Sequence, residues 1–303
     1  MKRHLWLVAL LLPALAPART LGELTFTPCT LASEGALTSI AARCTTLDVP
    51  EDRAAPDGRR IALSIAWVAP EAGEATPDPV FLLAGGPGQS ARESYPSLER
   101  AFADIAQHRN VILVDQRGTG GSNRLGCGGE DESESDESIA SVERHARACL
   151  DALSQHADVR HYTTTEAVAD LDAVRQAIGA QTINLVGISY GTRVAQQYLK
   201  AHPATVRSVV LDGVVPNTLV LGRDHAKNLD AALAAQFRHC VDLPACAETL
   251  GDPQARLHAL AEELRAAPRT VRYRDATTGE PAEGEFGYPM LAALLRLYAY
   301  QPA

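Results

Sequence analysis

The residues best suited to chemistry form the run Gly187-Ile188-Ser189-Tyr190-Gly191, which fits the pattern G-x-S-x-G. In this pattern the serine lies on a cramped turn from a strand to a helix, so the residues two before and two after it lack bulk. The turn lifts the hydroxyl to a helix N-terminus, where free N–H groups favour developing negative charge. Ser189 is therefore the predicted nucleophile; the alternative is a glycine-rich turn with a structural role only.

A second glycine-rich run, Ala84-Gly85-Gly86-Pro87-Gly88, directly follows the apolar residues Pro79–Leu83. Glycines there let backbone amides approach a substrate carbonyl oxygen. Tyr190, the residue after the nucleophile, would supply the other N–H of an oxyanion hole. Neither a following Lys-Ser/Thr pair nor G-x-G-x-x-G is present, which disfavours a phosphate-binding loop.

The third polar segment is Asp115–Ser122, which follows the apolar run Asn110–Val114. Ligand clefts form at the carboxyl ends of parallel strands, so this position lies near a predicted site. A tether between Asp115 and Arg117 that holds the loop is favoured over a direct part in catalysis.

The elements that must position these segments alternate between strand and helix. Short apolar runs bounded by turn residues predict buried strands, and helical spacing of apolar residues predicts helices. The expected strands are Pro79–Ala84, Asn110–Val114, Thr182–Val186 and Val206–Leu211, and the expected helices are Tyr95–Gln107, Glu166–Ile178 and Tyr190–Ala201. This alternation predicts an α/β fold with a mostly parallel sheet and helices on both faces.

Two flanking regions depart from this alternation. Cys29–Arg59 is expected to be rich in loops with a short strand at Thr46–Val49, and Arg60–Val68 alternates like a half-buried edge strand. From Gly222 the expected elements are helices at Gly222–Cys240, Gln254–Ala266 and Pro289–Tyr300, a strand at Arg269–Asp275 and a turn at Thr277–Gly279. The change predicts a core over residues 19–220 and a helical cap region over 221–303.

The first residues have the three-part layout of a secretory signal peptide. Lys2 and Arg3 precede the apolar run Leu5–Leu12, and Ala16-Pro17-Ala18 supplies small residues for cleavage. The run is too short to span a bilayer stably, and no later apolar stretch is long enough, so no stable membrane anchor is expected. The sequence predicts a signal peptide over residues 1–18 and export to the periplasm or the medium; the alternative is an N-terminal core helix.

Export gives the six cysteines a role, because an even number in an oxidising compartment favours disulfides. They fall into neighbouring pairs, which favours the pairing 29–44, 127–149 and 240–246 among fifteen connectivities. Zinc is the alternative, but no CxxC or Cys/His cluster occurs, so neither a metal nor another cofactor is expected. The acidic run Glu130–Ser138 lacks the glycine placement of a calcium loop and is expected to be solvated.

The composition limits the class of partner. The net charge is −9 and aromatic residues make up 5%, so neither attraction to nucleic acid nor a base-stacking surface is expected.

Five segments together resemble the α/β-hydrolase superfamily: "LLAGGPGQSA", "VDQRGTGGSN", "YTTTEAVADLDAVRQAIG", "INLVGISYGTRVAQQYLKAHP" and "SVVLDGVVP". More narrowly, they are similar to exported serine exopeptidases of the proline iminopeptidase and tripeptidyl aminopeptidase group. The resemblance is dense from Cys44 to Pro216 and looser in the cap region. It departs at Ala84, where family members often have histidine.

The resemblance implies acyl transfer from the N-terminal part of a peptide with a free amine. Ser189 would attack the scissile carbonyl, and the amides of Tyr190 and Gly86 would hold the oxyanion. Acidic residues of the cap commonly hold the amine in this group; Glu280, Glu283 and Glu285 are candidates, but no motif selects among them.

The rest of a catalytic triad is not recognisable. The family places the acid and then the histidine beyond the cap, but the histidines after Ser189 are expected to be surface or capping residues, since none follows a late buried strand: His202, His225, His239 and His258. Asp212 could be the acid, although a structural turn is favoured. The chain is therefore expected to end inside the cap and to have little peptidase activity alone; an esterase or a non-catalytic binding protein are the alternatives.

Overall fold

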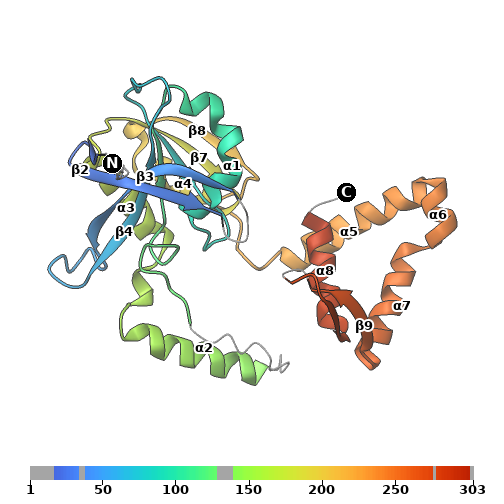
Figure 1. Cartoon of the computed structure of the whole chain (residues 1–303). Coiled ribbons are helices and arrows are strands. Elements are labelled where there is room, and N and C mark those ends of the chain that lie inside the picture. Colours follow the sequence, from blue (N-terminus) through green and yellow to red (C-terminus); the bar gives the residue numbers. More distant parts are fainter. Residues whose placement is uncertain (1–16, 34–37, 128–138, 276–277, 301–303) are drawn as a thin grey trace, which may run out of the picture. The chain divides into compact units, whose positions relative to one another are not determined.

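A computed structural model describes residues 17–33, 38–127, 139–275 and 278–300 (Figure 1). The chain divides into two compact units, Met1–Thr218 and Leu219–Ala303, hereafter the first and second units. Nearly all of the predicted signal peptide and the whole acidic run Glu130–Ser138 lie outside the described residues, as does Thr277 of the predicted turn.

The first unit contains a mixed sheet of eight strands. Their order is β1 (Arg19–Leu21), β2 (Leu24–Ala32), β3 (Ser39–Pro50), β4 (Arg60–Val68), β6 (Val111–Val114), β5 (Val80–Leu83), β7 (Ile183–Ile188) and β8 (Val206–Asp212). Neighbours from β1 to β6 pair antiparallel, whereas β6, β5, β7 and β8 are parallel. The α/β fold is therefore confirmed, and the parallel arrangement holds for the four strands that carry the predicted site.

The amino-terminal half of the sheet corrects two predictions. The region expected to be rich in loops, Cys29–Arg59, contains the end of β2 and the whole of β3, and Thr27–Ala32 pair with Ser39–Cys44. Strand β4 lies inside the sheet between β3 and β6 and is not an edge strand. Both errors have one cause: pairing with neighbouring strands holds these residues in the sheet, and the apolar pattern of a single segment does not reveal that pairing.

Strands β5 and β6 are buried on both faces, as their continuous apolar sequences predict. Phe81 and Leu83 join an apolar cluster that includes residues of α3 (Thr164–Ala177) and α4 (Tyr190–Ala201). The alternate residue Leu82 joins a second cluster that includes residues of α1 (Ala91–Ala106). Helices therefore cover both faces of the parallel strands.

In the first unit, α1 and α2 depart most from the predictions. Helix α1 begins four residues before the predicted Tyr95 because Ser90 caps it: its Oγ accepts the Glu93 N–H at 3.1 Å. Helix α2 (Ile139–Ser154) was not predicted. Single turns of 3₁₀ helix, η1 (Val159–His161) and η2 (Pro203–Thr205), precede α3 and β8.

The second unit is mostly helical. It contains α5 (His225–Asp242), α6 (Pro244–Leu250), α7 (Pro253–Ala266), the antiparallel hairpin of β9 (Arg269–Arg274) and β10 (Pro281–Phe286), and α8 (Tyr288–Tyr300). Helix α6 and strand β10 were not predicted. Short polar strands such as β10 carry little apolar periodicity, so the pairing with β9 is their main determinant.

The predicted cysteine pairing is confirmed in all three cases: Cys29–Cys44, Cys127–Cys149 and Cys240–Cys246 are disulfides. The first joins β2 to β3 and the third joins α5 to α6. Within the described ranges, no helix has the length and apolar character needed to cross a membrane.

A buried carboxylate holds the amino ends of the parallel strands together. Asn184 Nδ2 donates to Asp78 Oδ2 at 2.9 Å, and the Nε atoms of Arg109 and Arg207 lie 3.1 and 3.2 Å from the same oxygen. Burial favours the neutral acid, but hydrogen bonds from Asn184 and Arg109 outweigh it and lower the pKa of Asp78 from 3.8 to about 2.

We expect Asp78→Asn to destabilise the first unit by about 2 kcal/mol at pH 7, where the folded and unfolded carboxyls are both ionised. Because the folded pKa lies below the unfolded value, this stabilisation is complete above about pH 4 and decreases as the pH falls towards about 2. Urea unfolding at pH 7 and pH 3 should show a gap between wild type and variant that shrinks at pH 3. The control is Asp57→Asn on an exposed side chain; an unchanged gap for Asp78→Asn would contradict this account.

Candidate active site

Ser189 lies on the turn between β7 and α4 with an unusual backbone conformation. Its φ is 53° and its ψ is −120°, and Asn123 is the other non-glycine residue with positive φ in the described part of the chain. Such a conformation is strained and persists only where surrounding structure enforces it. The residue is exposed, and among the described residues its hydroxyl has no hydrogen-bond partner. The turn thus presents a free hydroxyl at the start of a helix.

Two glycines make this turn possible by lacking side chains. A β-carbon on Gly187 would lie 2.5 Å from the Gly191 carbonyl oxygen, and one on Gly191 would lie 2.0 Å from the Leu83 carbonyl oxygen. Both distances are far below van der Waals contact, so the start of α4 packs directly on the end of β5. The predicted requirement for small residues on both sides of Ser189 is confirmed.

The glycine loop, defined as residues 84–90, runs beside the nucleophile because of strand register. Leu83 pairs with Gly187, so the residues that follow each of them leave the sheet at the same edge. A β-carbon on Gly85 would lie 3.1 Å from Ser189 Cβ. Gly86 follows with a φ of 102°. Tyr190 is the first residue of α4, where backbone N–H groups have no acceptor within the helix. The segments that carry Ser189, Tyr190 and Gly86 are therefore brought together.

An open cavity of about 520 Å³ adjoins the glycine loop. It is lined by Gly85, Gln89 and Ile188 near the nucleophile and by the charged residues Glu93 and Arg124. Both charged side chains are exposed. Across the described residues, no group of three or more His, Cys, Asp or Glu side chains is arranged to hold a metal ion.

Asp115 and Arg117 do not form the predicted tether with each other. Asp115 accepts hydrogen bonds from Ser90 Oγ at 2.6 Å and from the Gly121 N–H at 3.0 Å. Arg117 instead donates from Nε and Nη2 to the two oxygens of Asp170 at 2.6 and 2.7 Å. That prediction is wrong in its partners, because the two side chains point to different elements. Asp115 and Arg117 therefore hold the loop after β6 at two separate places. The hydrogen bond from Ser90 to Asp115 joins this loop to the glycine loop.

Two histidines of the first unit lie at the opposite edge of the sheet from Ser189. His202 caps the far end of the twelve-residue α4, which by helix geometry is about 18 Å away. Its Nδ1 lies 3.9 Å from Asp172 Oδ2, a histidine–carboxylate pair on the wrong side for catalysis. His108 precedes β6, and its carbonyl oxygen accepts the Thr76 N–H at 2.8 Å.

The other described histidines have different surroundings. His156 follows α2, and its backbone N–H donates to the Leu153 carbonyl oxygen at 3.0 Å. His161 Nε2 lies 3.7 Å from carboxylate oxygens of Asp52 and Asp158, and His145 Nδ1 lies 2.9 Å from the Ser141 carbonyl oxygen within α2. Those of the second unit are exposed, as a position on a solvated helix surface predicts: His225, His239 and His258. No described contact joins a histidine to Ser189.

Asp212 supports the turn through its backbone. Its carbonyl oxygen accepts the Ser189 N–H at 2.8 Å, whereas its side chain is exposed. Thr192 Oγ1 donates to the Ser189 carbonyl at 2.6 Å and accepts the Val215 N–H at 2.8 Å. These bonds fix the turn after β8 against the start of α4, which supports the structural role expected for Asp212.

The three candidates for binding a substrate amine lie on β10 or next to it in the second unit. Glu283 and Glu285 are on the exposed face of the strand, and Glu283 pairs with Arg272 Nε at 3.0 Å. Glu280 precedes the strand, and its carbonyl oxygen accepts the Asp275 N–H at 2.9 Å.

Sequence reasoning missed Ser90 and Arg92. The pattern Ser-x-x-Glu over residues 90–93 is a helix-start signal that could have revealed the cap and its position at the end of the glycine loop. Arg92 gives no comparable signal, because its side-chain partners Cys44, Ser64 and Asp115 come from three separate strands or strand ends.

The fold and the geometry of the turn agree with a comparison against known families. Residues 78–289 match the model of the alpha/beta hydrolase fold family. The matched range contains the glycine loop, Ser189 and most of the second unit. The chain belongs to this family.

Three relatives narrow the class. The chain is 26% identical to serine protease Hip1 of Mycobacterium tuberculosis, over 90% of this chain and 56% of that protein. It is 26% identical to tripeptidyl aminopeptidase of Streptomyces coelicolor, over 74% and 45%. It is 32% identical to carboxylesterase B of Mycobacterium tuberculosis, over 78% and 51%. The chain spans about half the length of these relatives and is a hydrolase-family protein related to serine peptidases.

We expect Gly191→Ala to be severely destabilising, because the new methyl group would overlap the Leu83 carbonyl and force α4 away from β5. The loss should be about 3 kcal/mol or more, measured by urea or thermal unfolding of the purified chain. Gly126→Ala is the control, since a β-carbon there meets nothing within 4 Å. Equal stability of the two variants would contradict the close packing of α4 on β5.

Proposed function

We propose that the chain is a serine hydrolase of the exopeptidase type, which releases N-terminal residues or short peptides through an acyl-enzyme on Ser189. The observation that carries this proposal is the exposed Ser189, held at positive φ with the glycine loop against it. A strained conformation with no packing role at an exposed position is typical of a functional residue. Serine protease Hip1 and tripeptidyl aminopeptidase among the relatives support the peptidase class.

The proposed chemistry follows from the groups around the turn. Ser189 Oγ attacks the scissile carbonyl carbon while a general base takes its proton, and the N–H groups of Gly86 and Tyr190 stabilise the oxyanion. The same base then protonates the leaving amine as the C–N bond breaks. Water hydrolyses the acyl-enzyme and restores Ser189. The N-terminus of α4 adds a favourable dipole at the oxyanion.

Among the described residues of the first unit, no side chain that could act as the general base contacts Ser189. His202 and His108 lie at the far edge of the sheet. Loss of one triad member removes most of the rate enhancement but leaves about 10³–10⁴-fold over water in known serine proteases. We therefore propose that this chain alone hydrolyses its substrates weakly.

The proposed substrate is a peptide with a free N-terminus, met outside the cytoplasm in the periplasm or the medium. Three disulfides support an oxidising compartment. The amine would be bound by carboxylates, for which Glu280, Glu283 and Glu285 of the second unit are proposed. Neither a cofactor nor nucleic acid is part of the proposal.

A second candidate function is ester hydrolysis by the same serine. The observation in its favour is the relative named carboxylesterase B, which is 32% identical. Esters need no protonation of a poor leaving group, so a site without a strong acid would cleave them more readily than amides.

The test uses the purified chain with tripeptidyl and aminoacyl p-nitroanilides, their N-acetylated forms and p-nitrophenyl esters, with Ser189→Ala as the control. We expect slow cleavage of free-amine amides that depends on Ser189, and acceleration by added imidazole, which supplies a base. Cleavage of esters alone would favour the second candidate. Robust turnover without imidazole would contradict the missing base, and rates equal to Ser189→Ala under all conditions would contradict the acyl-enzyme.

A further inference from the structure

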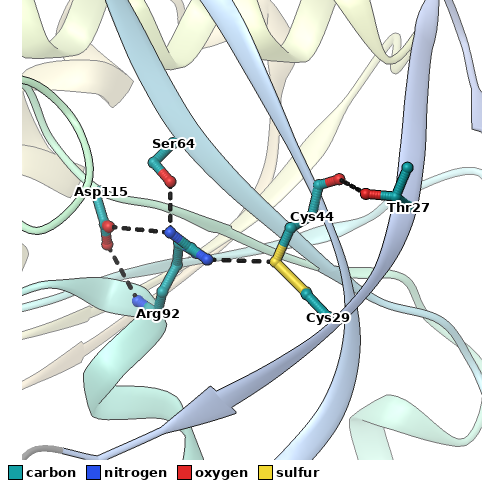
Figure 2. The surroundings of a disulfide bond; sticks show 6 residues. All are labelled: Thr27, Cys29, Cys44, Ser64, Arg92 and Asp115. Carbon is teal, nitrogen blue, oxygen red and sulfur yellow. Dashed lines mark hydrogen bonds and ion pairs between the residues drawn. A yellow bond between two sulfur atoms is a disulfide. The ribbon is translucent and has the colours of Figure 1, made fainter.

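Arg92 lies between Asp115 and the Cys29–Cys44 disulfide (Figure 2). Its Nη2 donates to Cys44 Sγ at 3.2 Å, and its Nη1 donates to Ser64 Oγ. Nη1 also lies 3.9 Å from Asp115 Oδ2. The Arg92 side chain is 24% exposed and that of Asp115 is 1% exposed. The guanidinium is therefore held mostly out of water by three partners, one of which is a disulfide sulfur.

Asp115 connects this guanidinium to the glycine loop. Its Oδ1 accepts the Ser90 hydroxyl at 2.6 Å and the Arg92 backbone N–H at 3.2 Å, and its Oδ2 accepts the Gly121 N–H at 3.0 Å. Ser90 is the last residue of the glycine loop, and its Oγ also caps α1. A continuous series of contacts thus runs from Cys44 through Arg92 and Asp115 to Ser90.

This series depends on charge and on a fixed sulfur position. A carboxylate as buried as that of Asp115 needs a positive partner, and removal of one partner of a buried pair leaves the other charge uncompensated. The Cys29–Cys44 disulfide fixes Cys44 Sγ between β2 and β3. Reduction leaves the Cys44 side chain free to change rotamer, so the guanidinium loses a defined contact.

We propose that Arg92 is a positioning residue for the glycine loop and that the Cys29–Cys44 disulfide sets its position. The oxidised protein then holds the loop beside Ser189, and the reduced protein holds it less firmly. The relevance of this coupling to catalysis rests on the proposed function; the coupling itself is a property of the fold.

Hydrogen exchange measures the coupling directly, since the backbone N–H groups of Arg92, Glu93 and Gly121 donate within this network. The Gln89 N–H reports on the glycine loop itself, where it donates to the Gly85 carbonyl. The variants are Arg92→Met, Arg92→Lys and the double replacement Cys29→Ala/Cys44→Ala, and the matched control is Cys240→Ala/Cys246→Ala in the second unit. We expect exchange about tenfold faster over residues 85–93 and 115–122 for Arg92→Met and the first disulfide variant. Arg92→Lys should be intermediate, because it keeps the charge but lacks the second nitrogen.

A combined variant separates coupling from general loosening. If the disulfide acts through Arg92, replacing both cysteines in the Arg92→Met background should accelerate exchange little further. In all variants, exchange in α4, residues 190–201, should match wild type. In the Cys240→Ala/Cys246→Ala control, exchange over residues 85–93 and 115–122 should also match wild type. Unchanged exchange in the glycine loop, or fully additive effects, would overturn the proposal. Should the double cysteine variant not fold, the Arg92 variants retain the disulfide and still decide the positioning role.

Exchange needs no turnover, so this experiment fails or succeeds independently of the proposed function. Prolonged labelling of Ser189 by a fluorophosphonate in the presence of imidazole, which supplies the missing base, reports the function separately on the same samples. A coupled loop with an unreactive Ser189 would leave the positioning intact and contradict the hydrolase. A reactive Ser189 with an uncoupled loop would do the reverse.

Discussion

The direct packing of the start of α4 on the end of β5 is the constraint on which the site depends. No side chain fits between Gly191 and the Leu83 carbonyl, so the chain must turn sharply after β7. The turn is made at Ser189, whose backbone adopts a φ of 53°. The same close approach brings Gly85 against Ser189, which makes the nucleophile and the glycine loop a single geometric unit.

Contacts at both edges of the sheet hold Ser189 and the glycine loop in place. At the amino ends of the parallel strands, Asp78 gathers Asn184, Arg109 and Arg207. At the carboxyl ends, the Asp212 carbonyl oxygen accepts a hydrogen bond from the Ser189 N–H, and the Asp115 carboxylate accepts one from the Ser90 hydroxyl. Buried carboxylates that accept several hydrogen bonds favour one arrangement of their donors, and an oxyanion site requires such a fixed arrangement.

Most elements of the parallel half were predicted from local signals, whereas several elements and contacts that depend on pairing or on other segments were missed. Continuous apolar runs located β5 to β8, and the glycines around Ser189 revealed the turn, because both depend on neighbouring residues. Strand β3 and the inward position of β4 depend on pairing across the sheet, and Arg92 depends on three separate segments. The Asp115–Arg117 tether failed for the same reason: adjacent positions in sequence gave no information on which elements their side chains reach.

The most direct test of this account is a crystal structure of the chain after prolonged reaction with a small fluorophosphonate. The account predicts a phosphorus–oxygen bond to Ser189 alone, with the phosphoryl oxygen about 3 Å from the N–H groups of Gly86 and Tyr190. A phosphoryl oxygen that points away from both amides, or a Ser189 that remains unmodified, would contradict it.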